Sequence, residues 1–581
     1  MKRETLTGFV ATLFAVTLLV AISPAAAAPM PGAPWIEQAP ADKVLPDLTS
    51  GIARRPAVLL ETDYLVYGPG TGFTTPNLTV TINDRNYAPA VNVYLYWQNR
   101  ATGALAYYSL ATGQFTSQER DLFGIPGVPA KVLTPDLNNF QLFGPNGALG
   151  GLPSSVPTAT GQYQFVFEIR NADSGQPVAR GNAMFNFVDG VQAHSGTLSN
   201  SETWTNNFAH FIAAPVNVFS PATLTIQPGT VVLGSAAGQG TLVVRQGARI
   251  NASGTADLPI IMTSELPVGQ RAPGDWGGLV INGFAPTNQN NPAGEGNSGP
   301  YGGNDPNDNS GTLRYVRVEF AGILFSDQNE LNGIALQGVG RGTTIEYIQI
   351  HRGQDDGLEF FGGTADAKYV LITGANDDSL DWTFGWQGRM QYVVVVQNAG
   401  NEDRAIEADN FESNPNALPR SAPSIANATF ISNAGLNPSE PSEVVRLRRG
   451  TGGNITHTIA AFGPEEGVRV TEDETLAILG TELRWRNSFF YNNNSLTDSQ
   501  AVADYINAAA QGNSAANAQL INPQSTIQPD VAPIGGSPAR NAGALPAEFQ
   551  NDGFFDNVTF AGGVNPNNPW TEDGWVTYSQ D

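Results

Sequence analysis

Residues 353–410 read GQDDGLEFFGGTADAKYVLITGANDDSLDWTFGWQGRMQYVVVVQNAGNEDRAIEADN, and this stretch contains one acidic motif three times. The copies are DDGLE at 355–359, DDSLD at 377–381 and EDRAIE at 402–407, with starts 22 and 25 residues apart. A tyrosine-led apolar run follows each of the first two copies. A repeat of this length, with one short strand and one acidic corner per copy, is typical of a solenoid. If the coils stack, their carboxylates stack as well.

Short apolar segments continue this rhythm through most of the chain. They occupy residues 224–230, 242–248, 259–264, 276–283, 313–320, 345–350, 369–372, 392–396, 428–431, 458–461 and 488–491. Each is too short to be stable unless neighbouring segments stack on it. Because tight corners and no helical crossovers join them, the series predicts a right-handed, single-stranded parallel β-helix over residues 195–540.

The first part of the chain has a different pattern. Its segments alternate apolar with polar residues and are separated by Gly, Pro and Asn turns; they are residues 57–67, 78–82, 91–97, 163–170 and 183–188. This pattern predicts an immunoglobulin-like β-sandwich over residues 57–192, which makes the protein all-β. At the other end, we expect the aromatic tail of residues 541–581 to cap the open end of the β-helix.

The first residues have the order of a secretory signal peptide. Lys2 and Arg3 precede an apolar run over residues 6–22, and small residues at 25–28 follow. We therefore expect a signal peptide at residues 1–28 and a linker rich in Pro and Ala at 29–56. No later stretch is apolar enough to span a bilayer. The predicted location is outside the cell or at its surface, with the periplasm as a further option.

Composition limits the partners of this protein. The net charge of −24 argues against nucleic acid or an anionic membrane and fits cation binding. The chain has no cysteine, so an exported form must be held together by burial and hydrogen bonds, which suits a long stacked sheet.

Three longer motifs carry a family resemblance. They are GDWGGLV at residues 274–280, YGGNDPNDNSGTLRYV at 301–316 and DDGLEFFGG at 355–363. From about residue 195 to its end, the chain resembles exported bacterial β-helix proteins, the Bacteroidota type of surface protein or lipoprotein. The resemblance implies a secreted or surface β-helix and brings no established catalytic residues. The chain lacks the lipobox cysteine of the lipoprotein members.

Aligning the acidic motifs with residues 442–446 and 465–469 gives two columns of side chains, because side chains alternate along a strand. The inward column is Leu358, Leu380, Ile406, Val445 and Val468. The outward column is Glu359, Asp381, Glu407, Arg446 and Arg469. Coils lie about 4.8 Å apart, so the three carboxylates repel one another unless a cation, a proton or an arginine neutralises them.

One interpretation of the acidic column is structural. Arg446 and Arg469, with Arg404, Arg448 and Arg449 nearby, would close salt bridges along it. The paired aspartates would then form Asx turns at the corners. A second interpretation is calcium, held between coils by oxygen ligands. Its candidate ligands are Asp355, Asp356, Asp377, Asp378 and Asp403.

The third interpretation is catalysis by a polysaccharide hydrolase or lyase. The candidate catalytic residues are Asp356, Asp377, Asp378, Glu359 and Asp381. Acids on adjacent coils, about 5 Å apart, would suit a retaining glycosidase, and alternate coils an inverting one. A lyase would need calcium on the aspartates and Arg446 or Arg448 as base. Against catalysis, the chain has only four histidines, none of them one coil after Asp377.

A bound glycan would need contact residues on the same face. The candidates are Trp382, Phe384, Trp386, Glu407 and Arg446. The three aromatic residues fit packing at the corners at least as well as stacking on a sugar ring. Taken together, the sequence favours a surface or secreted β-helix that acts as a structural, adhesive or glycan-binding module with calcium assistance. A polysaccharide-active enzyme is the alternative.

Overall fold

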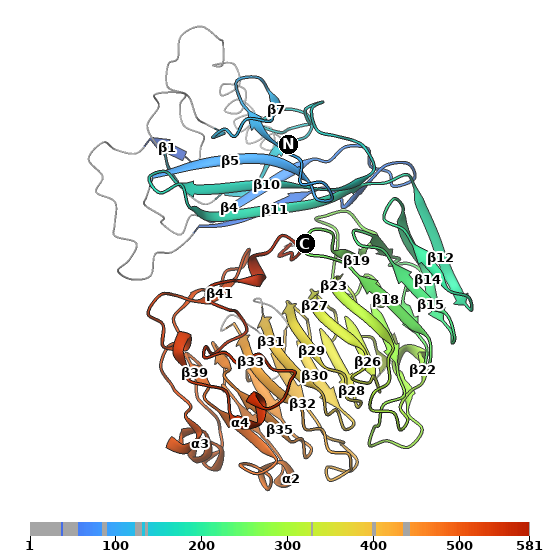
Figure 1. The fold of residues 1–581 in the computed structure, drawn as a ribbon, viewed down its shortest axis with the longest axis vertical. Helices are drawn as coiled ribbons and strands as arrows, with labels where there is room; N and C mark the ends of the chain where they lie inside the picture. Colours follow the sequence, from blue (N-terminus) through green and yellow to red (C-terminus); the bar gives the residue numbers. More distant parts are fainter. Residues whose placement is uncertain are drawn as a thin grey trace, which may run out of the picture. The chain divides into compact units, whose positions relative to one another are not determined.

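The computed structural model describes residues 36–38, 56–83, 90–122, 131–133, 137–326, 329–397, 402–433 and 442–579. The chain divides into two compact units, which chiefly comprise residues 1–190 and 191–579 (Figure 1). The predicted signal peptide, and the predicted linker apart from residues 36–38 and 56, lie outside the described residues.

The first unit contains two β-sheets. One has the strand order β1 (Ile36–Gln38), β8 (Lys131–Leu133), β5 (Ala90–Asn99), β10 (Gly161–Asn171), β11 (Pro177–Phe187) and β3 (Val66–Tyr67), with β6 (Leu105–Ser109) and β7 (Gln114–Thr116) continuing from β5. The other is β2 (Ala57–Thr62), β4 (Leu78–Asn83) and β9 (Leu137–Phe143).

The two sheets pack face to face, as the sandwich prediction requires. Phe143 of β9 lies 6.3 Å from Phe165 of β10, measured between ring centroids. Strand β11 approaches β2 so closely that a Cβ at Gly181 would lie 2.7 Å from Cγ1 of Val58. Glycine is therefore required at this crossing, since any side chain would push the sheets apart.

The second unit is a parallel β-helix, as predicted, with 24 strands connected in one winding sheet (Figure 1). One side of each coil forms what we call the front sheet. Its strands are β17 (Leu242–Val244), β20 (Leu279–Asn282), β26 (Ile334–Gln337), β28 (Leu358–Phe361), β30 (Leu380–Thr383), β32 (Ile406–Ala408), β34 (Val445–Leu447) and β37 (Arg469–Val470).

The other two sides of the coils are formed mainly by longer, bent strands. These are β23 (Gly311–Glu319), β27 (Thr344–His351), β29 (Ala367–Thr373), β31 (Arg389–Val396) and β33 (Ser424–Ile431). Shorter strands replace them at the two ends: β12 (Val191–Leu198), β13 (Glu202–Trp204), β14 (Ala209–Val218), β15 (Thr223–Ile226), β16 (Val231–Gly234), β18 (Arg249–Ser253), β19 (Ile260–Ser264), β35 (Gly453–Thr456), β36 (Ile459–Ala461), β38 (Leu483–Arg486) and β39 (Phe489–Tyr491).

A ladder of tyrosines marks the bend in the long strands. Tyr315, Tyr347, Tyr369 and Tyr392 all have positive φ, between 47° and 63°. Their rings stack in succession, with centroids 4.4, 4.2 and 4.8 Å apart. Bulky residues rarely adopt this backbone conformation. Stacking of aromatic rings provides attraction that offsets the cost at each bend. We call these four residues the tyrosine ladder.

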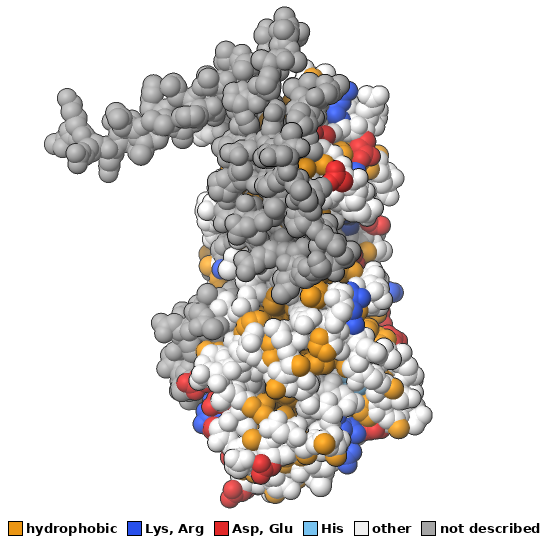
Figure 2. Space-filling view, turned by 90° about the vertical axis from the view of Figure 1, so that its left-hand side faces the viewer, with side chains coloured by type: hydrophobic (Ala, Val, Ile, Leu, Met, Phe, Trp, Pro, Cys, Tyr) orange, Lys and Arg blue, Asp and Glu red, His pale blue; other side chains and the backbone are white. Residues whose placement is uncertain are grey.

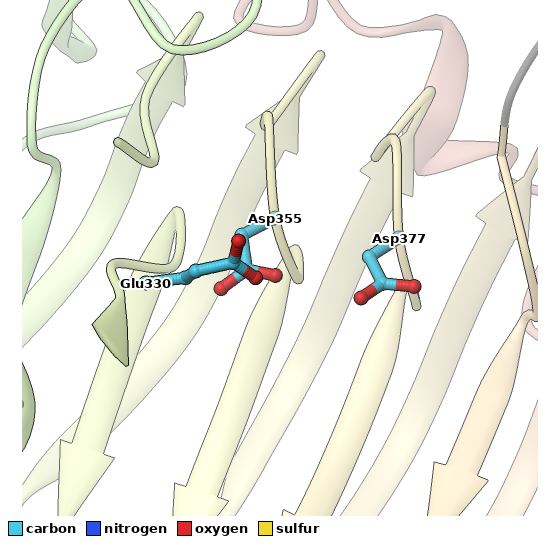
Figure 3. Close-up of side chains that lie close together, drawn as sticks. All are labelled: Glu330, Asp355 and Asp377. Carbon is cyan, nitrogen blue, oxygen red and sulfur yellow. The ribbon is translucent and has the colours of Figure 1, made fainter. Parts of the chain in front are cut away.

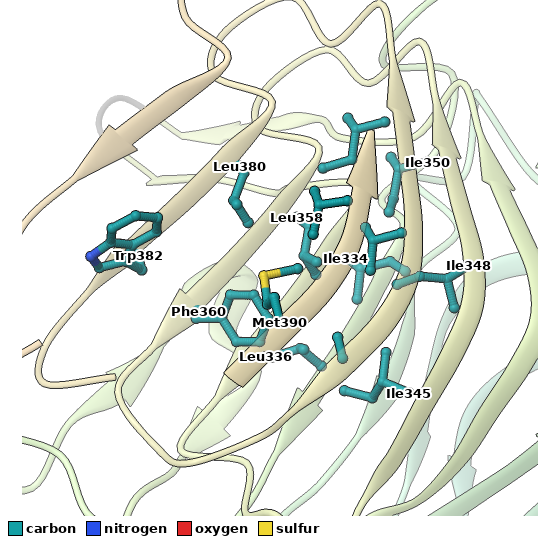
Figure 4. Close-up of a cluster of buried hydrophobic side chains, with 14 of the residues drawn as sticks. Ile334, Leu336, Ile345, Ile348, Ile350, Leu358, Phe360, Leu380, Trp382 and Met390 are labelled. Atoms are coloured by element: carbon teal, nitrogen blue, oxygen red, sulfur yellow. The ribbon is translucent and has the colours of Figure 1, made fainter. Parts of the chain in front are cut away.

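The core of the β-helix follows the inward column expected from the sequence. Leu358 pairs in register with Leu380, Leu380 with Ile406, and Ile406 with Val445. These side chains are fully buried, and Figure 4 shows Leu358 and Leu380 among isoleucines of the bent strands. The aliphatic column is therefore the interior of the solenoid.

The C-terminal region does not cap the β-helix in the way we expected. Helix α3 (Gln500–Asn507) packs Val502 and Ile506 against the main core, and β40 (Leu520–Asn522) with β41 (Asp530–Pro533) follows it. The aromatic tail instead runs back along the outside of the bent strands, where Trp570 and Trp575 pack against the tyrosine ladder. The short helices α2 (Asp473–Leu476) and α4 (Ala547–Gln550) complete the unit.

Figure 2 views the molecule from the side on which β39, β41 and α3 lie in Figure 1. On the part of this face that belongs to the β-helix, charged side chains are few and lie mostly near the margins. Acidic side chains do not gather on this part of the face.

Replacing Leu380 by alanine tests the inward column. We expect a loss of about 2–5 kcal/mol in the free energy of unfolding, because a buried leucine leaves a cavity in a stacked core. The matched control is Leu418→Ala, since Leu418 is 77% exposed. Urea denaturation followed by tryptophan fluorescence measures both. Equal, small effects of the two substitutions would contradict the assignment of Leu380 to the interior.

Candidate functional site

The front sheet carries a column of side chains that changes character along the solenoid. The strand register places Ala335, Glu359, Asp381, Glu407, Arg446 and Arg469 next to one another in this order. The column is apolar up to Ala335, acidic over three coils and basic at its end. The register expected from the sequence is therefore correct.

The corners that lead into these strands add two further columns. Asp355, Asp377 and Asp403 begin the corners, and each is followed at once by Asp356, Asp378 or Arg404. The backbone N–H of Asp378 donates to Oδ1 of Asp356 at 3.0 Å, and that of Arg404 donates to Oδ1 of Asp378 at 2.9 Å. The second aspartate of each pair thus bonds to the next coil. This replaces the Asx turn that we expected within one corner.

Stacked corners bring carboxylates from different coils together. Four groups of three carboxylates each have oxygens within 4.8 Å of one another. They are Glu330, Asp355 and Asp377; Asp356, Glu359 and Asp381; Asp377, Asp378 and Asp403; and Asp378, Asp381 and Glu407. All the candidate calcium ligands and candidate catalytic acids predicted from the sequence belong to these groups.

The first of these groups is the most open to solvent, and we call it the corner triad. Glu330 and Asp377 are exposed and Asp355 is half-buried. Figure 3 shows Asp355 and Asp377 on successive corners, while Glu330 reaches Asp355 from the neighbouring coil. Glu330 belongs to the short strand β25 (Asn329–Glu330), which pairs with β24 (Leu324–Ser326) in an insertion between coils. It lies outside the repeat, so sequence reasoning missed it.

A second residue missed by the sequence is Glu295. It begins a short 3-10 helix, η1 (Glu295–Asn297), between β21 (Ala293–Gly294) and β22 (Gly299–Pro300). Nδ2 of Asn332 donates to Glu295 at 3.1 Å and to Glu359 at 2.7 Å. Oδ1 of this nearly fully buried asparagine has no hydrogen-bond partner within the described ranges. A buried oxygen left without a donor beside carboxylates suits a bound cation.

Burial and mutual repulsion make these carboxyl groups weak acids. Burial, with the charges of Glu330 and Asp377, raises the pKa of Asp355 to about 9. Burial, with the charge of Glu330, raises the pKa of Glu295 to about 8. The pKa values of Asp356, Glu359, Asp378 and Asp381 also lie well above normal, with burial as the largest cause and neighbouring carboxylates adding to it. At neutral pH the group either keeps protons or binds a cation.

At the other end of the acidic region, Arg404 supplies counter-charge. Its Nη1 lies 3.8 Å from Asp378 and 3.2 Å from Glu407, and it also pairs with Asp403. Its Nε lies 3.2 Å from Glu443. Burial lowers the pKa of Arg404, but these carboxylates outweigh burial and raise it above the usual value. The guanidinium therefore stays charged.

Three further arginines complete this network, of which Arg449 pairs with Asp409 at 2.7 Å and with Glu412 at 3.1 Å. Arg448 pairs with Glu407 and, at 2.7 Å, with Asp409. Arg446 pairs with Glu443 and lies 3.9 Å from Glu407. Arg469 pairs with Asp498 at 3.0 Å, so it does not take part in the ladder as we expected. Salt bridges thus account for the later coils and leave the earlier ones unexplained.

The earlier coils lack such partners. Across the ranges that the structure describes, six carboxylates form no salt bridge with lysine or arginine: Glu330, Asp355, Asp356, Glu359, Asp377 and Asp381. The acidic region therefore has a compensated end and an uncompensated end, and the corner triad lies at the uncompensated end.

The prediction that Trp382 and Trp386 stack on a sugar ring is wrong, whereas Phe384 lies partly at the surface. Trp382 and Trp386 have no exposed surface, and Figure 4 shows Trp382 in the core. Their indole N–H groups donate to Oγ1 of Thr451 and to the carbonyl of Ala365. Both are interior residues and cannot contact a glycan. Phe384 is partly exposed, and its ring packs edge-on to another phenylalanine of the corner region.

The histidines take no part in this region. His351 precedes Asp355 by four residues, but it faces the C-terminal tail, where Nε2 lies 2.9 Å from the carbonyl of Ser579. Burial lowers the pKa of His351 to about 3 and that of His210 to about 4, so both are neutral at physiological pH. Among the described carboxylate groups, none includes a histidine.

The fold defines a class of protein, the parallel β-helices. The family model described as "Pectate-lyase like beta helix domain" matches residues 196–527, more than half of the chain. The chain belongs to this family. No curated protein and no solved structure matches it. None of the described helices is long and apolar enough to cross a membrane.

The raised pKa values predict that stability falls as pH rises. Asp355 has a pKa of about 9 when folded and about 4 when unfolded, so its contribution is complete below pH 4 and is lost as pH rises through 9. With chelator present, the β-helix should be less stable at pH 9 than at pH 7. The buried histidines, whose pKa values are lowered, do not titrate in this window.

Asp355→Asn should remove part of this slope and leave the variant more stable than the wild type at pH 9. Urea denaturation at fixed ionic strength measures the effect. A pH-independent stability of the wild type between pH 7 and 9 would show that these acids are not perturbed.

Proposed function

We propose that this protein is an exported, calcium-dependent glycan-binding β-helix whose cation site is the corner triad. The observation that carries the proposal is the convergence of Glu330, Asp355 and Asp377, from successive coils, without a salt-bridge partner in the described chain. Calcium prefers carboxylate and amide oxygens and takes six to eight of them. Three carboxylates offer at most six oxygens, and geometry reduces that number.

The remaining coordination positions provide the link to a glycan. A cation on an exposed corner keeps positions for water or for hydroxyl and carboxylate oxygens of a sugar chain. Family membership supports a carbohydrate ligand, since pectate lyases act on a polysaccharide. Arg446 and Arg448, at the basic end of the outward column, would contact acidic groups of the same sugar chain. We place the protein outside the cell or at its surface.

A hydrolase or lyase receives less support from the geometry. Burial lowers the pKa of Arg448, but Glu407 and Asp409 outweigh burial and raise it, so this arginine is a poor base. Arg446 is likewise paired with Glu443. Asp356 and Glu359 have the raised pKa values of general acids, but both are almost fully buried. A buried acid reaches a glycosidic bond only if the corners open.

Calcium should raise the stability of the wild type. At a concentration 100 times its dissociation constant, the gain is about 2.7 kcal/mol. Asp355→Asn and Asp377→Asn should lose most of this gain, because each removes a charged ligand. Asp504→Asn is the matched control, since Asp504 is an exposed carboxylate of α3. Thermal unfolding with calcium or chelator measures all four proteins, and a gain that the triad variants retain would exclude this site.

Calcium binding should also release protons at pH 8, because the pKa of Asp355 lies near 9 in the cation-free protein. Calorimetric titration in two buffers of different ionisation enthalpy measures the number of protons released. Identical heats in both buffers would contradict displacement of a proton by the cation.

On a panel of polysaccharides, we expect calcium-dependent retention of acidic chains without new reducing ends or unsaturated products. The same panel with chelator is the control for the cation. Product formed by the wild type and lost in Asp356→Asn would establish the enzyme instead.

A further inference from the structure

The last 35 residues of the described chain form a separate segment on the outside of the β-helix. We call residues 545–579 the C-terminal strap. It begins at the last coils, where Glu548 pairs with Arg486, and continues to Asp552, which lies 2.6 Å from Arg389. It ends near earlier coils, where the carbonyl of Ser579 meets His351. The strap therefore runs from the last coils back towards earlier ones, opposite to the order in which the coils follow one another along the chain.

Two glutamines of the bent strands clamp the strap backbone in the same way. Gln349 donates to the carbonyl of Thr577 at 2.6 Å and accepts from its N–H at 2.8 Å. Gln391 donates to the carbonyl of Asp556 at 2.9 Å and accepts from its N–H at 2.8 Å. Both glutamines are fully buried beneath the strap. Each glutamine bonds to the backbone of one strap residue, so these contacts do not depend on the side chain of that residue.

Apolar contacts hold the strap between and beyond these clamps. Trp575 is fully buried and packs edge-on to Tyr315 at 5.6 Å, and Trp570 packs edge-on to Tyr369 at 5.7 Å. They belong to a second core outside the solenoid, which includes Leu371 of β29. The strap completes this core, since Trp570, Trp575 and Tyr578 pack against residues of the bent strands and of β40 and β41.

The end of the strap is bonded to one of the two strands that lead into the corner triad, and a histidine of that strand is bonded to the other. Nε2 of His351 lies 2.9 Å from the carbonyl of Ser579, and Nδ1 lies 2.7 Å from Oγ1 of Thr373. His351 is the last residue of β27 and Thr373 the last residue of β29. Asp355 follows His351, and Asp377 follows Thr373, after three intervening residues. The strap end thus bonds directly to the strand end that precedes Asp355, and it reaches the strand end that precedes Asp377 only through the His351 ring.

We propose that docking of the strap end positions Asp355 and Asp377, so that strap docking and cation binding at the corner triad favour each other. This inference rests on the proposed function, because it concerns the affinity of the same site. The coupling is reciprocal: if the docked strap strengthens calcium binding, calcium strengthens strap docking by the same factor. The element whose docking would be coupled to the site is the strap end, from Trp570 to Ser579.

The two glutamine clamps provide a matched pair of variants. Gln349→Leu removes the clamp next to the strands of the triad, and Gln391→Leu removes the equivalent clamp one strand beyond them. Both leucines keep the volume of a buried side chain. Calorimetric titration with calcium chloride should show roughly a fivefold or larger increase in dissociation constant for Gln349→Leu. The change for Gln391→Leu should be less than about twofold, within the usual non-additivity of distant sites.

The wild type offers a test that needs no variant. Calcium should slow hydrogen exchange of the Thr577 amide, which donates to Gln349, by the same factor as the affinity change. The Asp556 amide, which donates to Gln391, is the internal control and should change less.

The outcomes separate the two claims. If the wild type binds no calcium, the proposed function fails, and the coupling fails with it. If the wild type binds calcium and both leucine variants bind it as tightly as the wild type does, the coupling is overturned while the cation site stands. Calcium binding without any change in Thr577 exchange would overturn the coupling as well.

Discussion

The spacing between parallel coils, about 4.8 Å, is the constraint on which the rest of this structure depends. Once the chain winds as a parallel β-helix, a residue type repeated once per coil becomes a column of that type. Leucines such as Leu358 and Leu380 become the core, and tyrosines such as Tyr347 and Tyr369 become a stacked ladder. Both columns are attractive at this spacing. A column of carboxylates is not.

The acidic region shows two responses to this repulsion. On the later coils, Arg404, Arg446 and Arg448 replace or face the acids, and salt bridges neutralise them. On the earlier coils that the structure describes, the carboxyl groups form no salt bridges, and burial with neighbouring acids raises the pKa of Asp355 to about 9. A protein under selection for stability alone would place arginines along the whole column. The buried acids without salt bridges at the corner-triad end are unfavourable for stability. This is the physical reason to assign a ligand there, because functional sites are where the rules of local stability are broken.

Much of the fold was predictable because it depends on periodicity. The alternation around Leu358, Leu380 and Ile406 gave both the inward column and the register of the outward one. Strands β1, β6, β7, β8 and β9 of the first unit were missed because they are short or because polar residues break their alternation, as in the sequence LNNFQLF of β9. Strand β1 lies in the stretch that was predicted to be a linker. Trp382 was misplaced although it follows the inward Leu380 by two residues on the same strand, so that alternation already puts it inside; Trp386 lies beyond the strand end, where alternation no longer applies.

The site was only partly predictable. Aspartates 355 and 377 belong to the repeat, so their stacking followed from the register. Glu330 and Glu295 come from insertions, and nothing in the local sequence indicates that these loops fold back over the corners. The course of the C-terminal strap was not predictable either, because its contacts are with residues far away in sequence, such as Gln349 with Thr577.

A crystal structure of the protein with calcium, with the anomalous signal of the ion recorded, tests the central claim most directly. We predict one anomalous peak among the oxygens of Glu330, Asp355 and Asp377, at about 2.3–2.6 Å from its ligands. Absence of a peak there, with the carboxyl groups of Asp355 and Glu330 in direct hydrogen-bond contact, would contradict it. The acidic corners would then be neutralised by shared protons alone.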